Sequence, residues 1–141
     1  MAESVFRQTV KDSGLLDRFS IESAGTAGYH TGEKPDYRCI QTLEKHGIDY
    51  YSRARTVRKS DLSAFDMVLA MDHSNLLDLE SLQEGDNQRI ELFRTYDPTP
   101  GDYVVPDPYY GTISDFENVY DMVSRTSIAL LEHLKKTNKW E

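Results

Sequence analysis

The stretch that decides the fold is Met67-Val68-Leu69-Ala70-Met71, the longest apolar run of the sequence. An apolar run without polar alternation predicts a strand that is covered on both of its faces. Directly after it, Asp72-His73-Ser74 predicts the start of a helix that carries Leu76, Leu77 and Leu79. Further on, Ile90-Glu91-Leu92-Phe93 predicts another strand. A strand, a helix and a second strand in this order indicate a parallel pair.

The flanking segments extend this alternation in both directions. Apolar residues at helical spacing predict a helix from residue 1 to about Gly14, with no side chain before it to serve as its cap. The alternation in Phe19–Ser23 predicts a half-covered strand, and a further helix is expected from Pro35 to about His46. Ser114-Asp115-Phe116-Glu117 resembles a capping box that opens a final helix. Its predicted buried stripe consists of Phe116, Val119, Tyr120, Val123, Ile128, Leu131 and Leu134. The pattern therefore predicts an α/β fold with three strands.

Composition narrows the class of protein and its partners. With 141 residues, the chain is expected to form one domain over residues 1–141. The formal net charge of −8 repels a phosphate backbone, so no nucleic acid partner is expected. A single cysteine excludes an internal disulfide and multi-cysteine zinc sites, and we expect neither a metal nor a cofactor. With no apolar run of membrane length and no secretory leader, a cytoplasmic location without membrane contact is predicted.

The segment most suggestive of chemistry is Val105-Pro106-Asp107-Pro108-Tyr109-Tyr110-Gly111. Proline fixes the backbone angle φ, so a stiff loop holds the Asp107 carboxyl group at a defined place. An apolar, aromatic neighbourhood favours the protonated form of a carboxyl group, which suits a general acid. On the pattern alone, a plain Pro-Asp-Pro turn with surface tyrosines is the alternative interpretation.

The same segment, Asp-Pro-Tyr-Tyr-Gly followed by Ser-Asp-Phe-Glu, resembles the acid loop of the low molecular weight protein tyrosine phosphatases. The resemblance covers nearly the whole chain in order, through Ser23–Thr26, Tyr29-His30, Pro35–Arg38, Lys45–Ile48, Ala54-Arg55, Phe65–Leu76 and Tyr96–Pro98. It implies a three-layer, flavodoxin-like parallel sheet with helices on both faces. It also implies hydrolysis of a phosphotyrosine protein or a small aryl phosphate through a phosphocysteine intermediate.

The departure from the family concerns its signature, a cysteine followed after five residues by an arginine. No such pair occurs in the sequence, since Cys39 is followed at that spacing by Lys45 inside a predicted helix. We interpret Cys39 as a small helix residue without a catalytic part. Met1–Arg7 resembles the helix just behind the family's phosphate loop. The first, central strand and the phosphate loop are therefore expected to be missing, and the chain is predicted to be a truncated, inactive member.

The resemblance implies roles for individual residues. Asp107 would protonate the leaving phenolate and then activate water. Tyr29, His30, Tyr109 and Tyr110 would line the mouth of the site and bind the substrate, although ordinary loop aromatics are an equal alternative. In some family members the two tyrosines of the acid loop are themselves phosphorylated. A structural hydrogen-bonding role is expected for His46 and His73.

Loss of a central strand would leave strand edges without partners. Phe19–Ser23 would then pair directly with Met67–Met71, or the edges would pair with another chain, or the protein would be a loosely folded fragment. We expect a rearranged or self-associated sheet. A non-catalytic binding or interaction module of the same fold is the alternative function. A receiver domain is disfavoured because the paired acids it needs are absent, and an arsenate reductase because there are no additional cysteines.

Overall fold

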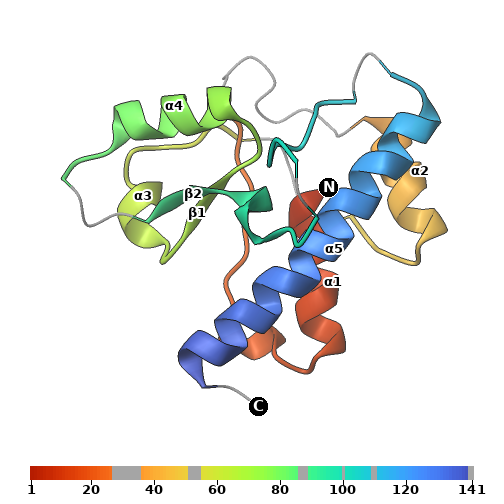
Figure 1. Cartoon of the computed structure of the whole chain (residues 1–141), viewed down its shortest axis with the longest axis horizontal. Coiled ribbons are helices and arrows are strands. Elements are labelled where there is room, and N and C mark those ends of the chain that lie inside the picture. The colour runs from red at the N-terminus through yellow and green to blue at the C-terminus, as the bar shows by residue number, and fades with distance from the viewer. Residues whose placement is uncertain (27–35, 51–54, 86–88, 100, 109–110, 140–141) are drawn as a thin grey trace.

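The computed structural model describes residues 1–26, 36–50, 55–85, 89–99, 101–108 and 111–139 (Figure 1). Its helices are α1 (Ala2–Asp12), α2 (Tyr37–Lys45), α3 (Asp61–Ala64), α4 (His73–Leu82) and α5 (Ile113–Asn138). Two short 3₁₀ helices, η1 (Leu16–Arg18) and η3 (Phe93–Tyr96), follow α1 and the second strand. The strands are β1 (Val68–Ala70) and β2 (Ile90–Leu92).

The two strands form a parallel pair in which Val68 lies opposite Ile90 and Ala70 opposite Leu92. Helix α4 makes the crossover between them, which is the usual connection for parallel neighbours. The two predicted strands and the helix between them are thus confirmed, although the second strand ends at Leu92 and Phe93 begins η3.

Both faces of β1 are covered, as the apolar run predicts. Leu69 packs against a large core cluster that contains Val5 of α1, Leu43 of α2 and Val123 of α5. Val68 and Ala70 belong to a smaller cluster on the other face, with Leu62 of α3 and Leu79 of α4. In Figure 1 the strands accordingly lie between α3 and α4 on one side and α1 and α5 on the other. The predicted α/β class with helices on both faces of a parallel sheet is confirmed.

The predicted strand at Phe19–Ser23 is wrong. Phe19 has an extended backbone (φ −126°, ψ 142°), but no ladder forms along this segment within the described part of the chain. The parallel contact occurs later, where Gly25 bridges to Thr56. The segment is instead held by side chains of α1: Phe6 packs edge-on against Phe19 at 5.6 Å, and Arg7 donates to the carbonyl of Ile21 at 2.9 Å. Alternation describes which side chains are covered, whereas a strand also needs a backbone partner.

The two long helices pack against each other, and their ends differ from the predictions in detail. Helix α1 begins without a side-chain cap, as expected. Helix α5 begins at Ile113, where the Asp115 carboxylate accepts from the backbone N–H of Thr112 at 2.7 Å, so the cap lies two residues before the predicted Ser114. The predicted burial of Ile128 is also wrong, because it is 55% exposed. Steps of three and four residues from Val123 lead to Thr126, Ser127 and Leu130, which are buried instead.

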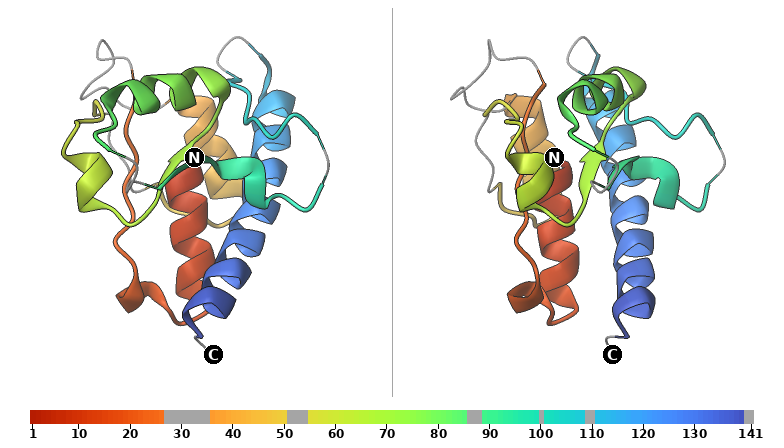
Figure 2. Two further views of the ribbon diagram at one scale, coloured as in Figure 1. Left: turned by 60° about the vertical axis from the view of Figure 1, so that its left-hand side comes forward. Right: turned by 90° about the vertical axis from the view of Figure 1, so that its left-hand side faces the viewer.

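The N-terminal end of the chain lies beside the sheet. The N-terminal end of α1 lies beside β1 in both views of Figure 2, and Met1 and Ala2 pack against the large core cluster. The C-terminal end of α5 lies away from the strands in both views. A segment joined to Met1 would therefore enter the molecule next to the sheet.

Candidate functional site

The loop that carries Asp107 is attached to the carboxyl end of β1. The backbone N–H of Val105 donates to the carbonyl oxygen of Met71 at 2.7 Å, and Val105 is buried in the large core cluster. Asp107 follows two residues later and is exposed. In parallel sheets the crevice at the carboxyl ends of the strands is the usual place for functional groups. The candidate acid is thus held at the chemically favoured edge of the sheet.

A second loop reaches the same edge. Asp72 caps α4 by accepting from the backbone N–H of Asn75 at 2.8 Å. The Asn75 side chain then donates to the hydroxyl oxygen of Thr26 at 3.1 Å. The small-residue loop at Ala24–Thr26 and the start of α4 therefore meet at the end of β1, although the sequence places them far apart.

The far end of the acid loop is fixed by Arg38. Its guanidinium donates to the carbonyl oxygen of Gly111 at 2.5 Å and lies over the Phe116 ring, 4.7 Å from the ring centre. Asp36 orients Arg38 through hydrogen bonds of 3.0 and 3.2 Å, and these bonds lower the pKa of the Asp36 carboxyl group. Gly111 has no room for a Cβ atom, because one would collide with the carboxylate of Asp115 that caps α5. The loop is thereby tied to both α2 and α5.

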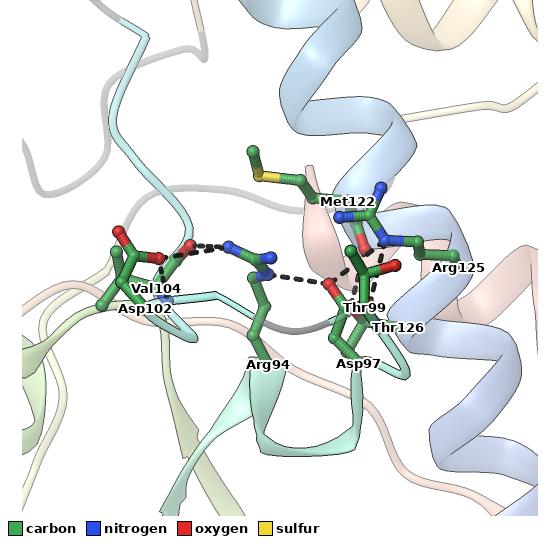
Figure 3. Close-up of polar contacts among 8 residues, drawn as sticks. All are labelled: Arg94, Asp97, Thr99, Asp102, Val104, Met122, Arg125 and Thr126. Carbon is green, nitrogen blue, oxygen red and sulfur yellow. Dashed lines mark hydrogen bonds and ion pairs between the residues drawn. The ribbon is translucent and has the colours of Figure 1, made fainter.

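The near end of the loop is fixed by a buried charge network that sequence analysis did not find (Figure 3). The side chain of Arg94 is 6% exposed, and its Nη1 donates to the carbonyl oxygen of Val104 at 2.6 Å. Its Nε donates to Asp97 at 2.9 Å, and Asp97 also accepts from Arg125 of α5 at 2.9 Å. Burial by itself raises the pKa of Asp97, but the bonds from Arg125, Thr99 and Arg94 outweigh it and lower the pKa to about 2.

The local sequence gives only a weak signal for this network. Asp97 lies in the Tyr96-Asp97-Pro98 segment that resembles the phosphatase family, but nothing in its neighbourhood indicates a partner 28 residues away. Tertiary packing of η3 against α5 brings the two charges together.

Four of the five predicted site residues lie outside the described residues, namely Tyr29, His30, Tyr109 and Tyr110. Asp107 is the fifth. Its side chain is exposed, and the two tyrosines that follow it lie outside the described residues, so the aromatic neighbourhood of Asp107 stays a prediction.

The other residues discussed from the sequence have structural positions. Cys39 is buried in α2 within the large core cluster, which confirms it as a small helix residue. His46 hydrogen-bonds Glu117 at 2.9 Å and stacks on Tyr120 with 3.7 Å between ring centres, which confirms its structural role. His73 is the exposed first residue of α4, and its hydrogen-bonding role stays a prediction.

Neither a metal-binding cluster nor a membrane-spanning helix occurs among the described residues. No group of three or more His, Cys, Asp or Glu side chains in the described ranges is arranged to hold a metal ion. None of the helices in that part of the chain combines the length and apolar character needed to cross a membrane.

Comparison with known proteins gives a consistent result over the whole chain. Residues 1–140 match the family model described as low molecular weight phosphotyrosine protein phosphatase. The chain is 41% identical to the human protein of that name over 138 residues, which is 94% of this chain and 85% of the relative. It is 41% identical over 140 residues to a low molecular weight protein-tyrosine-phosphatase of Streptomyces coelicolor, covering 96% of this chain and 85% of the relative.

Solved structures agree with the sequence relatives. The protein tyrosine phosphatase from Entamoeba histolytica, crystallised with Hepes in its active site, superimposes with a TM-score of 0.92 at 30% identity. The match covers 97% of this chain and 88% of that one. YfkJ from Bacillus subtilis gives a TM-score of 0.88 at 31% identity, over 96% of this chain and 86% of that one. The chain therefore belongs to the low molecular weight phosphotyrosine protein phosphatase family.

Proposed function

We propose that residues 1–141 form one domain that supplies the general acid of a phosphotyrosine phosphatase, and that this polypeptide alone does not catalyse the reaction. The hydrogen bond from Val105 to Met71 supports the first part, since it holds the loop of Asp107 at the carboxyl edge of the sheet. The sequence supports the second part, because it has no cysteine followed after five residues by an arginine. The substrate class is a phosphotyrosine protein or a small aryl phosphate.

The proposed reaction has two steps. In the first step a cysteine thiolate, which this polypeptide alone does not supply, attacks phosphorus and forms a sulfur–phosphorus bond. The bond from phosphorus to the aryl oxygen breaks at the same time, and the Asp107 carboxylic acid gives its proton to that oxygen. The Asp107 carboxylate then takes a proton from water, whose oxygen attacks phosphorus and releases inorganic phosphate and the thiolate. Tyr29, His30, Tyr109 and Tyr110 are proposed to contact the aryl ring of the substrate.

The isolated polypeptide is expected to be inactive, because the mechanism needs a nucleophile and a phosphate-binding loop in addition to the general acid. A general acid contributes about 10²- to 10⁴-fold to a rate, but only where a nucleophile already attacks. Cys39 is buried in the core and has no arginine at the required spacing. A phosphate dianion also needs a cradle of backbone N–H groups and a bidentate arginine. The loss of an N-terminal strand and phosphate loop from this protein stays a prediction.

The test compares two polypeptides in the hydrolysis of 4-nitrophenyl phosphate. The 141-residue chain is expected to show no turnover. The same chain joined at Met1 to a strand and a Cys-x5-Arg loop is expected to be active, and to lose activity when that cysteine becomes serine. Asp107→Asn in the extended chain should lower turnover of phenyl phosphate about 10²-fold or more. Thiol-dependent turnover by the 141-residue chain would refute the proposal, as would an unchanged rate in Asp107→Asn.

A non-catalytic binding module is the second candidate, because the acid loop is anchored at both ends in a chain without the nucleophile. Calorimetric titration with a phosphotyrosine peptide, and with its unphosphorylated form as control, separates the candidates. Preferential binding of the phosphorylated peptide by the 141-residue chain favours the module. Self-association through strand edges stays a prediction, and sedimentation velocity across a concentration series tests it.

A further inference from the structure

We propose that Arg94 is a positioning residue that fixes the near end of the acid loop and so sets the place of Asp107. This inference rests on the proposed role of Asp107 as the general acid. It adds a residue for which the sequence analysis assigned no role.

The Nε side of the Arg94 guanidinium is held by the buried carboxylate of Asp97. Its Nε donates to Asp97, whose side chain is fully buried, and Asp97 is itself held by Arg125 and by the backbone N–H of Thr99 at 2.9 Å. Removing a charge this deep from water is costly unless it is paired, so the Nε of Arg94 is expected to stay bound to Asp97. Helix α5, through Arg125, therefore fixes the direction in which the rest of the Arg94 guanidinium points.

The other side of the guanidinium faces the loop (Figure 3). Nη1 donates to the carbonyl oxygen of Val104 at 2.6 Å and to the carboxylate of Asp102 at 3.4 Å. These two residues flank Tyr103, whose φ of 60° is in the left-handed region. A residue other than glycine adopts that region at a cost of about 1–2 kcal/mol. Arg94 thus holds both neighbours of a strained residue.

The strained turn directs the chain toward the sheet. The Asp102 carboxylate also accepts from the backbone N–H of Val104 at 3.2 Å, which closes the turn. The next residue, Val105, makes the hydrogen bond to Met71, and Asp107 follows two residues later. If the turn at Tyr103 relaxes, the N–H of Val105 moves away from Met71 and Asp107 moves with it.

The geometry requires a guanidinium rather than any cation. Arg94 uses Nε for Asp97 and Nη1 for the loop, and these atoms lie on two sides of a rigid planar group. A lysine ammonium is a point charge that keeps the ion pair with Asp97 but does not span the distance to Val104. Arg94→Lys therefore separates the positioning contact from the buried charge balance, whereas Arg94→Met removes both.

The first test measures amide hydrogen exchange in the 141-residue chain. Arg94→Lys and Arg94→Met are expected to speed exchange of the Val105 amide about tenfold more than that of the Ile48 amide, which bonds Leu43 away from this network. Arg89→Met is the matched control, because Arg89 is an exposed arginine that bonds Glu91 and Tyr96. Equal changes at Val105 and Ile48 in Arg94→Lys would overturn the proposal. Arg94→Lys keeps this test decisive even if Arg94→Met does not fold.

The second test uses the extended chain with two substrates. Phenyl phosphate needs a proton on its leaving group, whereas 2,4-dinitrophenyl phosphate does not. Arg94→Lys should lower kcat/KM for phenyl phosphate about 10- to 100-fold and leave kcat/KM for the dinitrophenyl ester within about threefold. The ratio kcat/KM is compared because it covers only the steps up to loss of the phenol, whereas kcat also contains the later hydrolysis in which Asp107 activates water. Combined with Asp107→Asn, it should add no further loss. Equal losses on both substrates, or additive losses in the double variant, would overturn the proposal.

The two tests fail in distinguishable ways. If the extended chain hydrolyses neither substrate, the proposed function fails, and the exchange of Val105 alone decides whether Arg94 fixes the loop. If Val105 exchange is unaffected by Arg94→Lys while the extended chain is active, the positioning role is refuted and the proposed function stands.

Discussion

Replacing Asp97 with asparagine perturbs the buried charge network while keeping the size of the side chain. The asparagine oxygen can still accept one hydrogen bond, but the negative charge between Arg94 and Arg125 is lost. Arg94 then remains buried without a full counter-charge. Breaking a buried ion pair by removing one partner costs about 3–5 kcal/mol, so we expect the free energy of unfolding to fall by about 3 kcal/mol at pH 7.

The pKa of Asp97 gives a second, pH-dependent measure. Its value falls from 3.8 to about 2 on folding, and each pKa unit is worth about 1.4 kcal/mol, so the shift contributes about 2 kcal/mol. The folded-state pKa is lowered, so this stability is fully present above the unfolded value of 3.8. It is lost as the pH falls toward about 2. Roughly half of it should be gone at pH 3.

Urea unfolding, followed by circular dichroism at pH 6 and at pH 3, checks both numbers. The difference between wild type and Asp97→Asn should be about 1 kcal/mol smaller at pH 3. Glu132→Gln is the control, since Glu132 is 58% exposed and pairs with Lys135 at 3.5 Å, and it should change stability by less than about 0.5 kcal/mol. A loss in Asp97→Asn no larger than that of the control, or a loss that does not change with pH, would refute the network as described.

Two further variants and one labelling experiment test the core, the helix cap and the burial of the cysteine. Leu43→Ala should lower the free energy of unfolding by about 2–5 kcal/mol, because Leu43 is fully buried, whereas Leu77→Ala at a 66% exposed position should have little effect in the same urea titration. Asp115→Ala should lower the free energy of unfolding by about 1 kcal/mol, because it removes the acceptor for the backbone N–H of the N-cap residue Thr112, and thermal unfolding measures it. Cys39 should react with a disulfide reagent only when urea unfolds the chain, since the residue is buried. Rapid labelling of the folded chain would contradict that burial.

The local sequence pattern was sufficient to predict a strand where both faces of the segment are covered by apolar side chains. The run Met67–Met71 predicts a strand covered on both faces, and β1 indeed has a core cluster on each side. Pattern failed at Phe19–Ser23, where the alternation is correct for a strand but the described residues provide no backbone ladder. Strand formation depends on a partner from elsewhere in the chain, and no periodicity within the segment records it.

In the candidate site, too, the sequence suggested one residue and missed another. Asp107 could be proposed from the sequence because prolines and tyrosines beside it form a recognisable segment, and its role stays a prediction. Arg94 was not found, because the carbonyl of Val104 that it binds lies in an irregular loop ten residues away, and because Asp97 is held by Arg125 of α5, 28 residues further along the chain. A single arginine after an apolar strand has many possible roles, and only the packing of η3 against α5 selects one. A candidate residue in a recognisable segment is thus easier to predict than a residue whose partners come together only in the folded chain.

The two core clusters described above differ in size, and this difference has a consequence for how the molecule opens. The smaller one has Leu62, Ala70 and Leu79 at its centre, whereas the larger one joins α1, α2 and α5. Cooperative units with less buried apolar surface open more often, so α3 and α4 are expected to unfold transiently while the larger unit stays closed. The acid loop is fastened to the larger unit through Arg38 and the Arg94 network. Its geometry is therefore expected to outlast these openings, because Met71, which accepts the hydrogen bond from Val105, also packs against the larger cluster.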